Sequence, residues 1–193
     1  MLTKKKMDKI IRHFKVRRGE REIIYPFTTF SCVLEAEKTP ESVNRTLQLY
    51  LKNVFLNGVP ANLEKTVTEL PQLIMDIEKR ECELITLAAA ASYAGMKNQQ
   101  HECVQNYFLL QDPHTIATEI PVWDDITLGH IDLIRVLEGK IQVADFKPNA
   151  HKETKAASQV LRYISLLAKQ LNLPMRLFEG VYFDAKNAYF LKI

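Results

Sequence analysis

Two aspartates and a lysine in the second half of the sequence are the residue types needed to cleave a phosphodiester bond. Asp132, Asp145 and Lys147 lie in two stretches rich in β-branched and apolar residues. Carboxylate oxygens are the ligands that hard divalent cations prefer, and a lysine ammonium can stabilise negative charge that builds up on oxygen. Together these groups suit metal-assisted hydrolysis of a phosphate ester.

The pairing of these two stretches decides whether the carboxylates meet. Residues 129–137 and 140–147 are predicted strands. They are joined either by a two-residue turn at Glu138-Gly139 or by a four-residue loop that keeps the same pairing. Counting back from that turn, Asp132 lies opposite Asp145 on one face, with Cβ atoms ~4.5–5.5 Å apart. Like charges in this position destabilise a sheet, so the pair needs a cation. The alternative is that both acids face water at strand ends and the lysine neutralises them.

The surrounding elements predict an α/β fold in which helices flank a mixed central sheet and the N-terminal half is helical. From residue 116 the expected order is β-β-β-α-β-β. Its strands cover 116–123, 129–137, 140–147, 176–183 and 188–193, and its helix covers 151–173. Before residue 116 the pattern predicts helices at 4–18, from 41 to near 58, from about 62, and from about 72 to 110 with a break near Gly95. A strand or extended segment is expected within 22–36.

Composition narrows the class of protein. The chain has 193 residues and 47% apolar residues, which suits one domain with a full core. Its 3 cysteines argue for a reducing compartment and against a disulfide scaffold or a four-cysteine iron–sulfur cluster. No apolar run reaches the ~18–20 residues that span a bilayer, and no signal peptide is expected. These features predict a cytoplasmic protein without a membrane partner.

Positive charge is concentrated in residues 1–22, which hold nine Lys and Arg against three Asp and Glu. We therefore divide the chain into a basic N-terminal arm, 1–22, and a single domain, 23–193. Such an arm suits a polyanion, and Arg17 and Arg18 are its candidate nucleic-acid contacts. The alternative is a solvated helix whose charges only keep it dispersed.

Five sequence elements in order resemble the PD-(D/E)XK nucleases, and within them the RecB-like branch that includes RecB nuclease domains and the CRISPR adaptation nucleases. The resemblance depends on core motifs within residues 95–193. These are His101, Glu119, Gly129 to Asp132 as G-x-x-D, Asp145-Phe146-Lys147 as D-x-K, and Gln159 to Tyr163 as Q-x-x-x-Y.

The resemblance implies a restriction-endonuclease-like core and a role for each matching residue. Asp132 and Asp145 would coordinate Mg²⁺ or Mn²⁺, assisted by the Phe146 carbonyl, Glu119 and His101. Lys147 would position or activate the attacking water. Gln159 and Tyr163 would face the site and contact DNA. With 3 cysteines the chain resembles the members that carry no iron–sulfur cluster. Strand alternation, independently of the resemblance, makes His130 a further candidate phosphate contact.

The predicted function is a metal-dependent nuclease that hydrolyses DNA, with single strands or duplex ends as the expected substrates. Exonuclease and endonuclease activity both stay open, as do protein partners and a homo-oligomer. The alternative is a non-catalytic nucleic-acid-binding or assembly subunit that keeps the nuclease fold.

Overall fold

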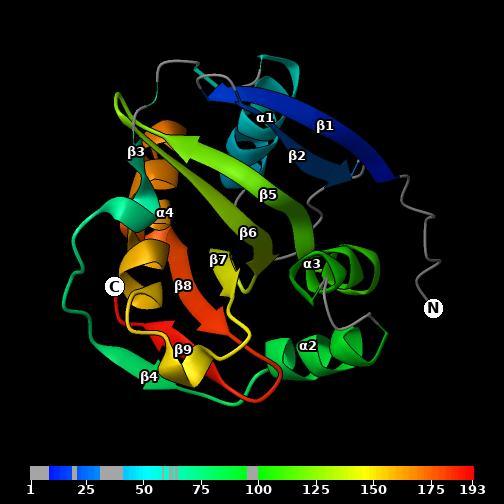
Figure 1. Cartoon of the computed structure of the whole chain (residues 1–193), viewed down its shortest axis with the longest axis vertical. Coiled ribbons are helices and arrows are strands. Elements are labelled where there is room, and N and C mark those ends of the chain that lie inside the picture. Colours follow the sequence, from blue (N-terminus) through cyan, green and yellow to red (C-terminus); the bar gives the residue numbers. More distant parts are fainter. Residues whose placement is uncertain are drawn as a thin grey trace.

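The computed structural model describes residues 9–18, 21–30, 41–57, 59–60, 63, 65–94 and 100–193. Within them, nine strands form one mixed sheet in the order β1-β2-β5-β6-β7-β8-β9-β4, and β3 pairs with β6 (Figure 1). The strands are β1 (Lys9–Arg18), β2 (Arg21–Phe30), β3 (Lys65–Thr66), β4 (Ile77–Lys79), β5 (Thr115–Trp123), β6 (Thr127–Leu137), β7 (Lys140–Phe146), β8 (Phe178–Phe183) and β9 (Ala188–Leu191). The α-helices are α1 (Glu41–Asn57), α2 (Glu83–Ala94), α3 (Gln100–Gln111) and α4 (Ala156–Leu171). The coarse prediction of an α/β fold with a mixed sheet flanked by helices is confirmed.

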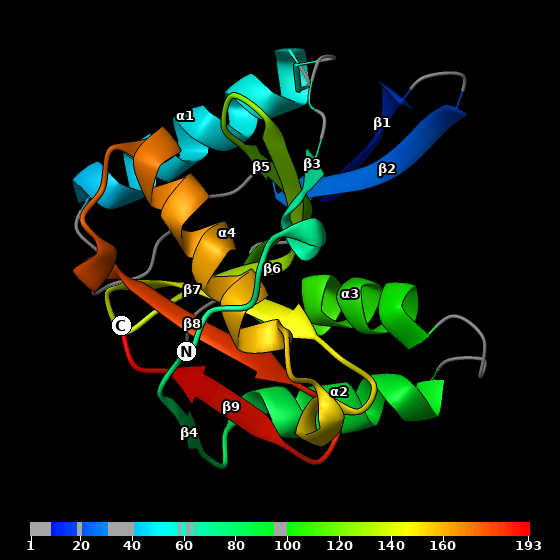
Figure 2. The same cartoon turned by 60° about the vertical axis from the view of Figure 1, so that its left-hand side comes forward.

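Helices cover both faces of the sheet, and each face has its own apolar cluster (Figures 1 and 2). On one side, α1 and α4 pack on the strands through Leu47, Leu51, Ile134, Val143, Val160, Ile164 and Leu167. On the other side, α2 and α3 pack through Leu84, Ala88, Val104, Phe108, Leu133, Ala144 and Phe183. Successive side chains along β6 and along β7 therefore point to opposite faces of the sheet. Because both faces are buried against helices, this alternation fixes the register of the hairpin.

The β6–β7 hairpin has the predicted turn and register. Glu138 and Gly139 have φ angles of 50° and 79°, the left-handed pair that a two-residue primed turn requires. Bonded pairs then run from Leu137↔Lys140 to Leu133↔Ala144. Strand β8 lies parallel to β7, so α4 must cross the sheet between them.

Several predictions for the N-terminal half are wrong. Residues 9–18 of the expected basic helix form β1, because pairing with β2 over ten positions outweighs a weak helical pattern. Residues 65–80 are a short strand, a 3-10 turn (Val67–Glu69), an extended stretch and β4, not a helix. The first half is therefore not wholly helical. The long helix expected from about 72 to 110 is α2 and α3, and its expected break at Gly95 lies outside the described residues.

Other predicted elements agree with the structure within a few residues. Helix α1 and the strands after residue 115 are confirmed, as is β2, although 31–36 lie outside the described part. Helix α4 begins at Ala156 rather than at 151, because Ala150–Lys152 form a separate 3-10 turn. The division into arm and domain at residue 22 stays a prediction. No helix among the described residues has the length and apolar character needed to cross a bilayer.

Candidate active site

Three predicted ligand residues converge where the start of α3 meets β5 and β6. His101 Nε2 lies 2.9 Å from Asp132 Oδ1 and 4.0 Å from Glu119 Oε1. One ligand atom from each of the three residues lies within 4.8 Å of the other two. The resemblance led us to expect this histidine late in a helix, but it is the second residue of α3. An imidazole nitrogen and two carboxylate oxygens are thus placed to share one cation.

The backbone of β5 is distorted at Glu119, directly beside Asp132. The β5–β6 pairs Thr118↔Leu133 and Ile120↔Ile131 lie on either side of it, so Glu119 faces Asp132 in this register. Its φ angle is 54°, a left-handed conformation that costs a non-glycine residue about 1 kcal/mol or more. The Gln105 amide donates a hydrogen bond to Glu119 Oε1. Strain of this kind, held in place by a neighbouring helix, is typical of functional sites.

Asp145 adjoins this cluster from β7. It occupies the next position after the last bonded β6–β7 pair, opposite Asp132, and the neighbouring Phe146 backbone N–H donates to Asp132 Oδ2 at 2.7 Å. Asp145 is only 1% exposed. Its Oδ2 lies 2.7 Å from Lys147 Nζ, and this buried atom has no hydrogen bond of good geometry within the described residues. The predicted meeting of the two aspartates with the lysine agrees with this arrangement.

Burial and mutual repulsion both disfavour the ionised form of the carboxyl groups in this cluster. Burial, followed by the charge of Asp132, raises the pKa of Asp145 well above its usual range despite Lys147. Burial and Asp132 likewise raise the pKa of Glu119. Burial would lower the pKa of His101, but its hydrogen bond and charge contact with Asp132 raise it overall. A divalent cation would relieve this excess of buried negative charge.

The donor set fits a hard divalent metal such as Mg²⁺ or Mn²⁺. Carboxylate oxygens suit both ions, and one imidazole favours manganese over magnesium. His101, Glu119 and Asp132 form the compact ligand set. Asp145 lies outside this set and interacts with the charges of Asp132 and Lys147. The Phe146 ring packs edge-on against His101, with centroids 5.9 Å apart. Coordination by the Phe146 carbonyl stays a prediction.

Gln159 and Tyr163 are one turn apart on α4 and bind each other. Gln159 Nε2 donates to the Tyr163 hydroxyl at 2.5 Å. The Tyr163 ring is buried against Gly129, where an added Cβ would lie 2.4 Å from Tyr163 Cε1. This close approach explains why a glycine precedes Asp132 by three residues. The predicted contact of both side chains with nucleic acid stays a prediction.

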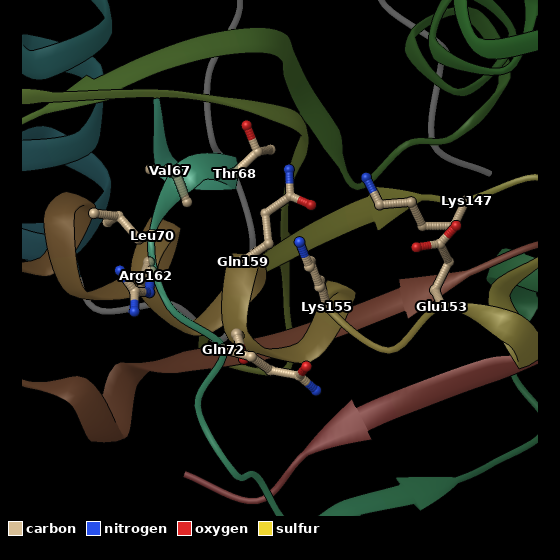
Figure 3. Close-up of a pocket in the computed structure, with 10 residues that line it drawn as sticks. Val67, Thr68, Leu70, Gln72, Lys147, Glu153, Lys155, Gln159 and Arg162 are labelled. Atoms are coloured by element: carbon tan, nitrogen blue, oxygen red, sulfur yellow. The ribbon is translucent and has the colours of Figure 1, made fainter. Parts of the chain in front are cut away.

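A pocket of about 230 Å³ lies beside the cluster, between α4 and residues 67–72 (Figure 3). Lys147 and Gln159 line it together with Lys155 and Arg162. On the side of α4, the candidate site thus continues into a pocket lined by positively charged side chains. Pattern reading missed this pocket, because residues 67–72 had been expected to be part of helical segments.

Three predicted contacts are not among the residues that the structure brings together at the candidate site. His130 lies opposite Pro121 on β6 and is not part of the converging ligand set. Arg17 and Arg18 lie in β1, opposite Glu22 and Arg21 of β2, and their side chains lie outside the described part of the chain. Their contact with nucleic acid stays a prediction.

Sequence reasoning also missed a second buried charged cluster, centred on Arg135. Its Nε donates to Asp112 Oδ2 at 2.6 Å, its Nη1 donates to Gln142 Oε1 at 2.7 Å, and its Nη2 lies 3.3 Å from Glu83 Oε2. Arg135 is 2% exposed. Because a guanidinium already occupies this group, the acids here are compensated. Gln105 was missed as well, although its spacing of four residues from His101 on α3 could have indicated a shared face.

Comparison with known proteins adds no relative, because no family model matches the chain and no curated protein matches it significantly.

Proposed function

We propose that this chain is a metal-dependent nuclease that hydrolyses phosphodiester bonds of DNA. The observation that carries the proposal is the convergence of His101, Glu119 and Asp132 beside the buried Asp145–Lys147 pair. The resemblance to PD-(D/E)XK nucleases of the RecB-like branch supports it, because the same residues matched that pattern in the sequence.

The chain's own residues would divide the work. Lys147 keeps its charge: burial would lower its pKa, but the neighbouring carboxylate of Asp145 raises it overall. The ammonium can therefore hold a non-bridging phosphate oxygen and offset the negative charge that grows there. A bound Mg²⁺ or Mn²⁺ would supply Lewis-acid activation of water and of the phosphoryl group.

Hydrolysis also needs an acceptor for the proton of the attacking water. Glu119 is the carboxylate placed for this role, because it lies beside Asp132 and His101 and its Oε1 is held by the Gln105 amide. In the balanced reaction, the water oxygen forms a bond to phosphorus while the bond from phosphorus to one sugar oxygen breaks. The departing oxygen gains a proton, and the other product keeps the phosphate.

A cleavage assay with matched lysine variants tests the proposal. Linear, circular and single-stranded DNA are incubated with Mn²⁺, Mg²⁺ or EDTA. Lys147→Ala should lower the cleavage rate by about 10²–10³-fold, as expected when one transition-state donor is removed. Lys140→Ala, an exposed lysine on the same strand, is the control and should cleave like the wild type.

Two outcomes would count against the nuclease. Metal-dependent cutting that survives Lys147→Ala would contradict the assigned mechanism. Binding of DNA without cleavage on any substrate would support the alternative, a nucleic-acid-binding or assembly subunit. Cutting of the circular substrate would identify endonuclease activity, and resistance of the circle an exonuclease.

A further inference from the structure

We infer that the pocket beside Lys147 is a subsite for one sugar–phosphate unit of a single DNA strand, with Lys155 binding the phosphate next to the one that is cleaved. This inference rests on the proposed function and names the form of DNA that the site accepts. Lys155 is not one of the residues that matched the nuclease pattern.

The pocket continues directly from the candidate active site. Lys147 and Gln159 belong both to its wall and to the predicted catalytic set. Figure 3 shows the Lys147 and Lys155 side chains entering the same pocket, with Gln159 between them and Thr68. A strand whose cleaved phosphate meets Lys147 would therefore place its neighbouring unit near Lys155.

The charge of the pocket suits an anion. Lys147, Lys155 and Arg162 line it against one acid, Glu153. Lys147 is already paired with Asp145, but Lys155 makes no salt bridge and no side-chain hydrogen bond with any residue in the described ranges. Arg162 adds positive charge to the wall, but its Nη2 is bonded to the Pro71 carbonyl. A free ammonium beside two further cations on a concave surface favours a phosphate, which offers several acceptor oxygens.

The wall opposite α4 is fixed before any ligand arrives. Ser158 on α4 binds Leu73 twice, accepting from its backbone N–H at 2.7 Å and donating to its carbonyl at 2.9 Å. Arg162 donates to the Pro71 carbonyl at 2.5 Å, and the Gln72 amide donates to the Thr154 carbonyl at 2.5 Å. These bonds hold residues 71–73 against the helix, so binding does not have to order this segment.

The size of the pocket selects a single strand. At about 230 Å³ it is smaller than the roughly 300–1,000 Å³ pockets that hold drug-sized ligands. One sugar–phosphate unit suits such a space, but a base pair does not. The pocket lies between α4 and residues 67–72, so a single strand reaches Lys155 without a complementary strand having to fit between these two walls.

The test compares Lys155, the residue just before α4, with Lys169 near the other end of that helix. Lys169 is exposed near the C-terminal end of α4 and does not line this pocket, so Lys169→Ala is the charge-matched control. Affinity for a fluorescent thymidine oligonucleotide is measured by anisotropy in EDTA. We expect Lys155→Ala to weaken binding by about tenfold, the effect of one charged hydrogen bond, while Lys155→Arg restores it. Lys169→Ala should bind within about twofold of the wild type.

Cleavage kinetics in Mn²⁺ locate the phosphate. Single phosphates of the oligonucleotide are replaced by neutral methylphosphonates, one position at a time. For the wild type, neutralising the position next to the cut should raise KM about tenfold, and for Lys155→Ala the same replacement should add little. A blunt duplex should bind more weakly than the single strand.

The outcomes separate this inference from the proposed function. If the wild type does not cleave but Lys155→Ala binds more weakly than Lys169→Ala, the result supports the phosphate subsite and contradicts the proposed nuclease activity. If Lys155→Ala binds and cleaves like Lys169→Ala, or its effect adds to that of every methylphosphonate, the subsite is wrong. Equal affinity for the blunt duplex and the single strand would overturn the assignment to a single strand.

Discussion

Two groups of charged side chains lie beside the same sheet, and they differ in how far the protein's own positive charges offset the carboxylates. In the Arg135 cluster, burial would raise the pKa of Asp112, but hydrogen bonds and charge contact with Arg135 outweigh it and lower that pKa. In the His101–Glu119–Asp132 cluster with Asp145, burial and Asp132 raise the pKa values of Glu119 and Asp145. Arg135 thus keeps Asp112 ionised, whereas Lys147 and His101 do not bring the pKa values of Asp145 and Glu119 back to their ordinary range.

This difference teaches how to tell a structural charge cluster from a site that awaits a ligand. Either group contains three potential metal ligands by geometry, since Glu83, Asp112 and His114 also lie close together. Geometry alone therefore does not distinguish them. The guanidinium of Arg135 contacts both acids in one group. In the other, the described residues pair Lys147 with Asp145 and His101 with Asp132, and no single cation bridges all the carboxylates.

The largest expected effect comes from removing the internal cation. Arg135→Met would leave Asp112 buried without its partner, and losing one member of a buried pair costs about 3–5 kcal/mol. Urea unfolding followed by circular dichroism measures this loss. Arg176→Met, at an exposed arginine, is the control and should change stability by less than about 0.5 kcal/mol.

A double variant guards against a trivial result. Adding Asp112→Asn to Arg135→Met removes the stranded charge, so part of the lost stability should return. If Arg135→Met cost no more than Arg176→Met, the Arg135 cluster would not be held together by this ion pair, and the comparison would fail.

The second effect comes from supplying the missing cation. Mn²⁺ at about 100 times its dissociation constant should stabilise the folded protein by about 2.7 kcal/mol, because it binds the folded chain and not the unfolded one. Asp132→Ala should abolish this increase. Glu83→Gln, in the compensated cluster, should leave it unchanged. Thermal unfolding with and without Mn²⁺ measures both. If Mn²⁺ stabilised Asp132→Ala but not Glu83→Gln, the metal would bind in the Arg135 cluster, and the comparison would be wrong.

The sequence predicted the charge-deficient cluster better than the compensated one, for a physical reason. The β6–β7 hairpin depends on local signals, namely a Glu-Gly turn and alternation of side chains, and these gave the register that brings Asp132 towards Asp145. His101 and Glu119 were expected from the resemblance to a nuclease pattern. The Arg135–Asp112 bond joins residues that are 23 positions apart, and nothing local to either residue indicates it.

Non-local pairing also explains the errors of fold. Residues 9–18 alternate too weakly to indicate a strand, and β1 owes its structure to β2, which continues the sheet through β5. Residues 70–76 look helical or featureless in sequence, but α4 and Lys192, which follows β9, satisfy several of their backbone groups. Partners supplied by distant segments cannot be inferred from a pattern within one segment.

The smallest expected effect, and the sharpest contrast, is the pH dependence of the metal-free protein. The folded protein holds the proton of Asp145 more tightly than the unfolded chain does, so it binds more protons in the window between the ordinary and the raised pKa. Stability should therefore fall as the pH rises through that window towards neutrality. The lowered pKa of Asp112 acts in the opposite sense: its contribution is present above the ordinary aspartate pKa and is lost as the pH falls through the folded value.

Asp145→Asn separates these two pH dependences of stability, because it removes the charge that burial disfavours while keeping the shape of the side chain. At neutral pH and in EDTA it should stabilise the protein by about 1–3 kcal/mol, because keeping Asp145 ionised costs about 1.4 kcal/mol for each unit by which burial and Asp132 raise its pKa. The variant should also lose less stability as the pH rises towards neutrality, and it should lose as much stability as the wild type at acid pH, where Asp112 is protonated. Urea unfolding across a pH series measures both effects. A variant that is less stable than the wild type at neutral pH in EDTA would mean that Lys147 already compensates Asp145. The two clusters would then be alike, and the need for an external cation would disappear.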